Sequence, residues 1–339
     1  MTEKINGWKG NISPKEIVEK ILSSKEIVLT THVNPDGDAM GSILALLLMI
    51  DEYNKKYIEK LSDLITVRIV VDDSLPKYME KFRESILIEK FENFSIKGEA
   101  DLFISVDCAN EERYGRAVEI KKNCRHSINI DHHISNTEHA EFNYVENVSS
   151  TSELLYKFLP LFKIEMTKEI AEYMYLGIIN DTGNFRNDNV TEETFEVCAK
   201  LSKAGADNHK IANIIFSMSM KKVNLFGDVY KNKLINEKYG FIYYYISQQK
   251  MKEFQVEKDD TDGIAELMLK IENMEISLFI REEENGTLKG SLRCNEKYDV
   301  NEIASEFNGG GHIKAAGFKT ELPVEKVLEI MLEKISNSQ

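Results

Sequence analysis

The chain has 339 residues, of which 42% are hydrophobic and 29% charged, and its formal net charge at pH 7 is −14. This length suits two domains rather than one, and the longest apolar run, residues 43–50, is far too short to span a bilayer. Proteins that track long nucleic acids neutralise many phosphates, so we expect this acidic chain to bind short pieces at most.

The N-terminal sequence and the spacing of the cysteines indicate the cellular compartment of the protein. The first ten residues, MTEKINGWKG, contain no apolar core of a secretory signal. The four cysteines (Cys108, Cys124, Cys198 and Cys294) form no CxxC pair, which argues against a disulfide framework or a thiolate zinc site. Scattered thiols are typical of a reducing compartment, and we predict a cytoplasmic protein.

Strand-like and helical segments alternate through the first half of the chain. A helix is predicted at residues 39–57, and strands are predicted at residues 26–31, 67–71, 101–106 and 126–130. Such alternation favours βαβ units, which build a parallel sheet with helices on both faces. Helices then dominate from residue 152 to about 229, with Ser152 and Thr167 as predicted N-caps.

The pattern changes near residue 228, where segments rich in β-formers begin. Strands are predicted at residues 240–247, 275–281 and 287–293, and the turn signal EENGT joins the last two into a hairpin. Helices are predicted at residues 264–271, 300–307 and 324–336. The sequence therefore predicts an α/β domain at 1–190, a helical linker at 191–227 and a smaller mixed α+β domain at 228–339.

Acidic residues and histidines follow three predicted strands and one later apolar segment. They belong to the segments THVNPDGDAMGS (residues 31–42), SVDCAN, IDHH and NDTGNF. The residues concerned are His32, Asp36, Asp38, Asp107, Asp131, His132, His133 and Asp181. Parallel sheets bind ligands beyond the carboxyl ends of their strands, near a reversal of strand order, so we expect these side chains to share one crevice.

So many carboxylates in one crevice cannot all stay ionised unless a cation neutralises them. An oxygen-rich set with imidazole and no thiolate favours Mn²⁺ or a similar octahedral ion, and Mg²⁺, Fe²⁺ and Co²⁺ stay open. Two metals that share a carboxylate fit the number of acids better than one. A single aspartate at a strand end is more often a helix cap or a turn residue, so the combination carries this interpretation.

A second signal is FNGGGHIKAAG, residues 307–317. Consecutive glycines let backbone N–H groups approach an anion closely, and concave nests of this kind bind phosphate. Arg293, at the end of a predicted strand, is suited to a phosphate or to a base. The alternative interpretation is a flexible glycine turn beside a solvated edge arginine.

In chain order, THVNPDGDAMGS, SVDCAN, IDHH and NDTGNF resemble the four motifs of the DHH phosphoesterases. The segment GSLRCN…DVNEIASEFNGGGHIKAAG is similar to the signature of their associated C-terminal substrate-binding domain, so the resemblance covers nearly the whole chain. DCANEERYG is close to the second motif of the branch of bifunctional oligoribonucleases and 3′-phosphoadenosine-5′-phosphate phosphatases. Cys108, Met40 and Asn308 depart from the usual residues, and none of these departures removes a ligand.

The resemblance implies two Mn²⁺ ions that share the carboxylate of Asp107. The ligands of the first ion would be His32, Asp36 and Asp107. The ligands of the second would be Asp38, Asp107, His132 and Asp181. His133 would face the scissile phosphate, and Asp131 would orient a ligand histidine or the loop. The nucleotide would be held by Arg293, Gly310, Gly311 and His312.

The reaction implied is two-metal hydrolysis, in which a water between the ions attacks phosphorus in line with the leaving oxygen. The implied substrates are short oligonucleotides and linear dinucleotides such as pApA, together with adenosine 3′,5′-bisphosphate. A phosphodiesterase of cyclic dinucleotides and a catalytically inactive nucleotide sensor are the alternatives. The sequence leaves open the substrate rank, the cleavage polarity, the native metal and whether the chain forms a homodimer.

Overall fold

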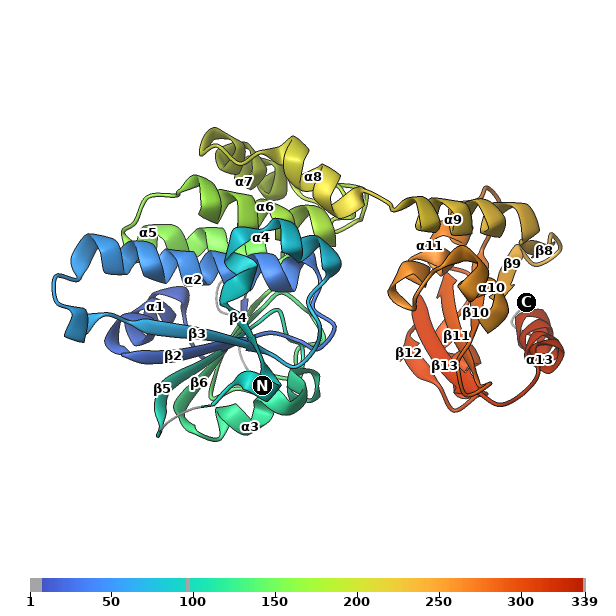
Figure 1. Ribbon diagram of the computed structural model, residues 1–339, viewed down its shortest axis with the longest axis horizontal. Helices are drawn as coiled ribbons and strands as arrows, with labels where there is room; N and C mark the ends of the chain where they lie inside the picture. The colour runs from blue at the N-terminus through green and yellow to red at the C-terminus, as the bar shows by residue number, and fades with distance from the viewer. Residues whose placement is uncertain (1–7, 96–97, 338–339) are drawn as a thin grey trace. The chain divides into compact units, whose positions relative to one another are not determined.

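A computed structural model describes residues 8–95 and 98–337 of the chain. The chain divides into two compact units, Met1–Ser217 and Met218–Gln339, coloured blue to yellow and yellow to red in Figure 1. Residues 1–7, which include most of the MTEKINGWKG segment, lie outside the described part. Within the described residues, no helix is both long enough and apolar enough to cross a bilayer.

The first unit is built on a seven-stranded sheet with the strand order β1-β7-β6-β5-β2-β3-β4. The strands are β1 (Trp8–Gly10), β2 (Glu26–Thr30), β3 (Thr66–Val71), β4 (Ile88–Lys90), β5 (Ala100–Val106), β6 (Cys124–Asp131) and β7 (Phe142–Glu146). Only the pair of β1 and β7 is antiparallel. After β2 the chain continues through β3 and β4 and returns on the other side of β2 as β5. The strand order therefore reverses between β2 and β5.

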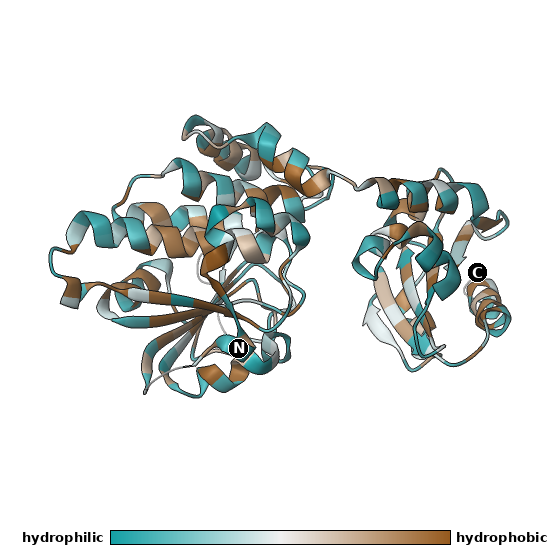
Figure 2. Ribbon diagram, viewed as in Figure 1, coloured by the Kyte–Doolittle hydropathy of each residue, from teal (hydrophilic) through white to brown (hydrophobic). Residues whose placement is uncertain are grey.

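Helices cover both faces of this sheet, and one face is covered more extensively. That face carries the larger core, formed with α1 (Pro14–Ser23), α2 (Gly37–Tyr57), α4 (Thr151–Leu155), α5 (Leu159–Phe162) and α6 (Lys168–Asp181). The opposite face packs around Phe103 against η5 (Glu111–Ala117) and α3 (Val118–Lys121). The first half of α2 is buried almost all round because it packs between the sheet and α6, and it is largely brown in Figure 2. Helices α7 (Glu192–Lys203) and α8 (Asn208–Phe216) complete the unit.

The second unit contains a six-stranded mixed sheet with the order β12-β13-β11-β10-β9-β8. The strands are β8 (Leu234–Asn236), β9 (Phe241–Ile246), β10 (Ile276–Glu282), β11 (Leu288–Cys294), β12 (Gly310–His312) and β13 (Ala315–Thr320). One face packs against α12 (Val300–Ser305) and α13 (Val324–Asn337). On the other face, α9 (Met220–Asn232), α10 (Gln248–Phe254) and α11 (Ile264–Leu269) cover β9 and β10. The part of this face over β11, β13 and β12 carries exposed and half-exposed residues.

The predicted α/β class, a parallel sheet followed by a smaller mixed domain, is confirmed. Strands β1, β4 and β7 were not predicted, because the first two have three residues each and β7 is short and interrupted by Asn143. The predicted cap Ser152 is wrong, since Ser150 accepts the hydrogen bond of Glu153 N and caps α4. The division between the units, after Ser217, falls inside the expected linker.

Candidate metal centre and nucleotide-binding face

Three neighbouring parallel strands carry the central side chains of the site. His32 follows β2, Asp107 follows β5 and His132 follows β6, so all three lie along the carboxyl edge of the sheet. Asp107 and His32 flank the reversal of strand order, where parallel sheets bind ligands. Asp107 has a left-handed backbone conformation (φ 56°), and strain of this kind in a non-glycine residue is typical of functional sites.

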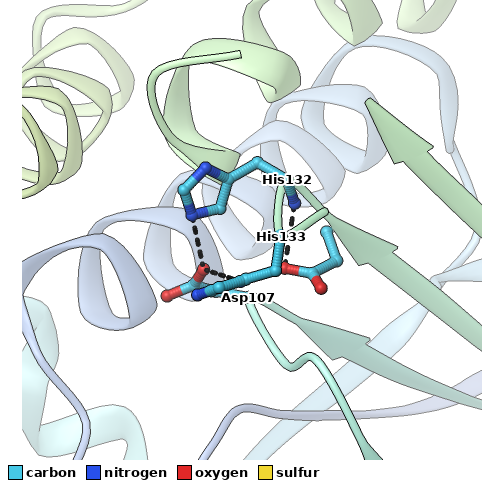
Figure 3. A group of neighbouring side chains, drawn as sticks. Asp107, His132 and His133 are labelled. Carbon is cyan, nitrogen blue, oxygen red and sulfur yellow. Dashed lines mark hydrogen bonds and ion pairs between the residues drawn. The ribbon is translucent and has the colours of Figure 1, made fainter. Parts of the chain in front are cut away.

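The carboxylate of Asp107 faces two histidines at once. Its Oδ2 lies 3.5 Å from Nε2 of His32, and its Oδ1 lies 3.5 Å from Nε2 of His132. Figure 3 shows His132 and His133 clustered around this carboxylate. A carboxylate that presents one oxygen to each of two histidines has the arrangement needed to bridge two cations.

The potential ligand atoms fall into three overlapping groups, and within each group they lie within 4.8 Å of one another. The groups are His32, Asp36 and Asp107; Asp38, His132 and Asp181; and Asp107, Asp131, His132 and His133. The structure therefore brings together all eight histidines and aspartates that the four N-terminal motifs predicted for the site.

The two aspartates of the first motif have different partners. Asp36 is the N-cap of α2, where its Oδ1 accepts hydrogen bonds from the backbone N–H of Asp38 and Ala39. Asp38 turns to α4 and accepts hydrogen bonds from Thr151 N at 2.6 Å and Ser152 N at 2.9 Å. A Cβ on Gly177 of α6 would lie 2.3 Å from Asp38 Oδ1, so this glycine makes room for the carboxylate.

Buried negative charge dominates the electrostatics of the centre. Burial, followed by the charge of Asp181, raises the pKa of Asp38 to about 6, and burial, followed by the charge of Asp38, raises the pKa of Asp107 to about 6. Burial alone would lower the pKa of His132, but its contact with Asp181 and the charges of Asp38 and Asp107 raise it above its usual value. A divalent cation resolves this conflict because it neutralises the carboxylates and replaces the proton on the histidine.

The hydrogen-bond partners of the ring nitrogens of His32 and His132 indicate whether these histidines can bind a metal. Nδ1 of His32 lies 2.8 Å from the carbonyl of Val33, and Nδ1 of His132 lies 3.1 Å from that of Val148. These carbonyls favour the tautomer with a proton on Nδ1, which leaves Nε2 as the electron-pair donor. Nε2 of His132 is buried and makes no well-directed hydrogen bond, although Asp181 Oδ2 is 3.1 Å away. Each Nε2 atom faces carboxylate oxygens of its own group of potential ligands, as metal ligands do, and the cluster can bind a divalent metal.

His133 is oriented by a carboxylate instead of a carbonyl. Its Nδ1 lies 2.7 Å from Oδ1 of Asp131, which is fully buried and accepts a further hydrogen bond from Asn136 Nδ2 at 2.6 Å. Burial acts to lower the pKa of His133, but the hydrogen bond and charge of Asp131 outweigh it and raise the pKa. This arrangement is compatible with the predicted roles of both residues.

Two polar residues beside the centre were not predicted. Thr151 donates its hydroxyl to Oδ1 of Asp107 at 3.1 Å, and Arg113 of η5 places Nη2 3.0 Å from Nδ1 of His32. Because arginine can only donate, this contact competes with the carbonyl of Val33 for Nδ1 of His32. Its place in DCANEER, six residues after Asp107, was a usable signal. Thr151 carried none, because only the fold brings α4 to the centre.

The predicted nucleotide-binding residues lie on one face of the second unit's sheet. The register pairs Arg293 with Ala315 and Ala315 with His312, so the side chains of Arg293 and His312 project from the same face with only a methyl group between them. Nε of Arg293 donates a hydrogen bond to Glu266 at 2.6 Å. His312 is exposed.

Gly310 and Gly311 of FNGGGHIKAAG lie in the edge strand β12 and not in the expected loop. The N–H of Gly311 donates to Asn301 Oδ1 at 2.9 Å, so it is not available to an anion. A Cβ on Gly311 would lie 2.4 Å from Ala315 O, which means that the fold itself requires this glycine. A Cβ on Gly310 would meet only Asn301 Oδ1, at 3.6 Å, so the fold does not require Gly310.

Comparison with known proteins agrees with this fold and site. Residues 26–178 match the DHH family, N-terminal domain, and residues 238–337 match the DHHA1 domain. The chain therefore belongs to the DHH family, and it is a metal-dependent phosphoesterase with a C-terminal DHHA1 domain. The predicted family and enzyme class are confirmed.

Similar proteins cover almost the full length of the chain. It is 28% identical over 304 residues to the probable bifunctional oligoribonuclease and PAP phosphatase NrnA of Streptococcus mutans, covering 89% of this chain and 92% of that protein. It is 27% identical over 335 residues to the bifunctional oligoribonuclease and PAP phosphatase NrnA of Thermus thermophilus, covering 95% and 94%. The crystal structure of an exopolyphosphatase-related protein from Bacteroides fragilis matches with a TM-score of 0.85 and 25% identity, covering 96% and 95% of the two chains.

Proposed function

We propose that this protein hydrolyses short oligonucleotides and linear dinucleotides such as pApA to mononucleotides, and removes the 3′-phosphate of adenosine 3′,5′-bisphosphate. The names of the Streptococcus mutans and Thermus thermophilus relatives support this substrate class. The observation that carries the proposal is Asp107, whose two oxygens face His32 and His132 separately. The net charge of −14 supports short substrates over long nucleic acids.

The cofactor proposed is a pair of Mn²⁺ ions. One would be held by His32, Asp36 and Asp107. The other would be held by Asp38, Asp107, His132 and Asp181. When bound, such ions supply Lewis acidity, which lowers the pKa of a water and offsets negative charge on the phosphoryl oxygens. The donor set of carboxylates and imidazoles without thiolate supports Mn²⁺, with Mg²⁺, Fe²⁺ and Co²⁺ as the alternatives to test.

The chain's own groups complete the proposed reaction. With Nδ1–H of His133 engaged by Asp131, Nε2 is the ring atom left to hydrogen-bond a phosphoryl or leaving oxygen. Asp131 then acts as a positioning residue. We propose that Arg293, Gly310 and His312 contact the nucleotide, whereas Gly311 serves the geometry of β12.

The cellular setting is part of the proposal. All four cysteines are free thiols, which suits the cytoplasm. A homodimer stays a prediction, which light scattering on the purified protein tests.

A panel of substrates with Mn²⁺ tests the function. The panel contains pApA, RNAs of about two to five nucleotides, adenosine 3′,5′-bisphosphate, cyclic di-AMP and pyrophosphate. We expect AMP from pApA, loss of turnover with a chelator, and a loss of at least about a thousandfold in Asp107→Ala. The control is Asp63→Ala, which removes an exposed aspartate.

The panel separates the alternatives. Turnover restricted to cyclic di-AMP would replace the proposed substrates with cyclic dinucleotides. Nucleotide binding without turnover of any substrate would identify a sensor. Full activity after exhaustive chelation, or in Asp107→Ala, would refute the metal centre.

A further inference from the structure

A second group of cations lies on the same sheet face as Arg293 and His312. Alternate residues of a strand project to one side, so Lys289, Ser291 and Arg293 of β11 share this face. The register places Lys319 of β13 directly opposite Lys289. Four residues of strand span about 13 Å, which separates this lysine pair from Arg293 by about that distance.

The fold does not explain this lysine pair. Like charges directly opposite each other in a sheet are destabilising. Both lysines are exposed, and among residues 8–95 and 98–337 neither side chain has a hydrogen-bond or ion-pair partner. The next cation in the row, Arg281 of β10, is opposite Lys289 but is already paired with Glu283 at 2.8 Å. In a chain of net charge −14, two adjacent unpaired lysines are best explained by an anion that they bind.

The surface between the lysine pair and Arg293 is suited to a ligand chain. The register aligns Ser291, Gly317 and Gly310 across β11, β13 and β12, so no large side chain rises between the two rows of cations. A hollow of about 60 Å³ extends from Arg293 past Ser291 to Lys289 along the α11 side. Glu266 and Asp262 also line this hollow, but Glu266 is paired with Arg293, and Asp262 lies in the field of Lys289.

We propose that Lys289 and Lys319 form a second phosphate-binding subsite, which holds a further phosphodiester group of an oligonucleotide whose terminal nucleotide is bound at Arg293 and His312. This inference rests on the proposed function and adds a length preference to it. A dinucleotide is too short to use both rows fully, whereas a chain of three to five nucleotides reaches the lysines. The subsite therefore favours the longer of the short substrates, and its contribution weakens with salt.

Binding without turnover tests the subsite. Fluorescence anisotropy of the full-length protein with labelled RNAs of about two and five nucleotides is measured in a chelator, so that no hydrolysis occurs. We expect the double variant Lys289→Gln/Lys319→Gln to weaken pentamer binding about tenfold. The loss for the dinucleotide is expected to be much smaller. The slope of log affinity against log salt for the pentamer should fall by about 0.7 for each phosphate contact removed.

Two further variants separate this subsite from general charge and from misfolding. Lys252→Gln/Lys326→Gln removes two exposed lysines from α10 and α13, and we expect it to keep the pentamer preference. Lys289→Glu places a carboxylate opposite Lys319, so it should raise the melting temperature while it removes the pentamer preference.

Different results would overturn the lysine subsite and the proposed function. Equal losses for both lengths in Lys289→Gln/Lys319→Gln, an equal loss in the control pair, or a wild-type protein without pentamer preference would each overturn the subsite. Absence of Mn²⁺-dependent pApA turnover would refute the proposed function, but the binding comparison would still decide the subsite.

Discussion

Replacing Asp107 by asparagine should stabilise the metal-free protein and abolish its stabilisation by Mn²⁺. Asp107 is 2% exposed and lies among Asp36, Asp38 and Asp181, so its charge is costly when no cation is bound. Asparagine has nearly the same shape and can still accept the hydroxyl hydrogen bond of Thr151. The substitution therefore removes the charge and little else.

The sign and size of the effect follow from the raised pKa of Asp107. Its pKa is raised from 3.8 to about 6, so between these values the folded state binds more protons than the unfolded state. The contribution of Asp107 to the free energy of unfolding is therefore most favourable below pH 3.8 and falls as the pH rises to about 6. At pH 7 the full cost of its buried charge is present. At about 1.4 kcal/mol per pKa unit, the cost is at most about 3 kcal/mol, and we expect Asp107→Asn to recover about 1–3 kcal/mol.

Fluorescence of the single tryptophan provides the assay. Trp8 lies in β1, so its emission reports unfolding of the unit that carries the metal centre. In urea with a chelator, the free energy of unfolding should be higher for Asp107→Asn than for the wild type. With Mn²⁺ at about 1,000 times its dissociation constant, the wild type should gain about 4.1 kcal/mol and the variant almost nothing. The order of the two proteins therefore reverses.

The control is Asp63→Asn, at an exposed position, which should follow the wild type in both conditions. If Asp107→Asn has a lower free energy of unfolding than the wild type in chelator, the buried charge is compensated within the protein. Equal Mn²⁺ stabilisation of both proteins would show that Asp107 is not a ligand. Either result would refute the reasoning.

Three further outcomes are expected. Asp131→Asn should lower kcat about 10- to 100-fold and shift the alkaline limb of the pH–rate profile to lower pH, because His133 loses the carboxylate that raises its pKa; an unchanged profile would contradict this. Gly310→Ala should unfold within about 0.5 kcal/mol of the wild type but bind nucleotide less tightly, whereas Gly311→Ala should lose about 1–3 kcal/mol in urea unfolding. Burial, and then a neighbouring lysine, lowers the pKa of His139 to about 4, so stability is lost as the pH falls from 6.5 toward 4. Since His139 is partly exposed, His139→Gln should reduce that loss by about 1 kcal/mol in unfolding curves at pH 7 and about pH 5.

The strand ends could be predicted because their pattern is local. β2 and β5 are short, mostly apolar strands, β6 ends in the buried segment SINID, and each strand leads into a histidine or an aspartate. Parallel sheets align such strand ends at one edge. His32, Asp107 and His132 therefore converge as expected. What the sequence could not provide is the partner of each oxygen. Asp38 has the position of a cap for α2, and only the packing of α2, α4 and α6 turns it toward Thr151.

The glycine-rich segment shows a different limit. Residues 309–311 have the composition of a turn or a nest, but Gly310 and Gly311 pair with β13 as part of an edge strand. The pairing depends on β13 and on Asn301, which are distant from the local pattern that suggested a loop. The hairpin of β10 and β11 was predictable because its turn signal lies between its strands. Neither pattern indicates that Lys289 and Lys319 are opposite each other, since that depends on the register of β11 with β13.

The two units differ in the charge that they present to a phosphate. This difference predicts one contribution to nucleotide affinity that needs no metal and one that does. Asp36, Asp38, Asp107 and Asp181 repel a phosphodiester until a cation neutralises them. The face with Arg293 and Lys289 carries its own positive charge and needs no metal. Nucleotide affinity should thus have a metal-independent part, lost in Arg293→Ala, and a part that appears only with Mn²⁺ and is lost in Asp107→Asn. Titrations with and without metal measure both parts, and an affinity that vanishes entirely in chelator would contradict this division of labour.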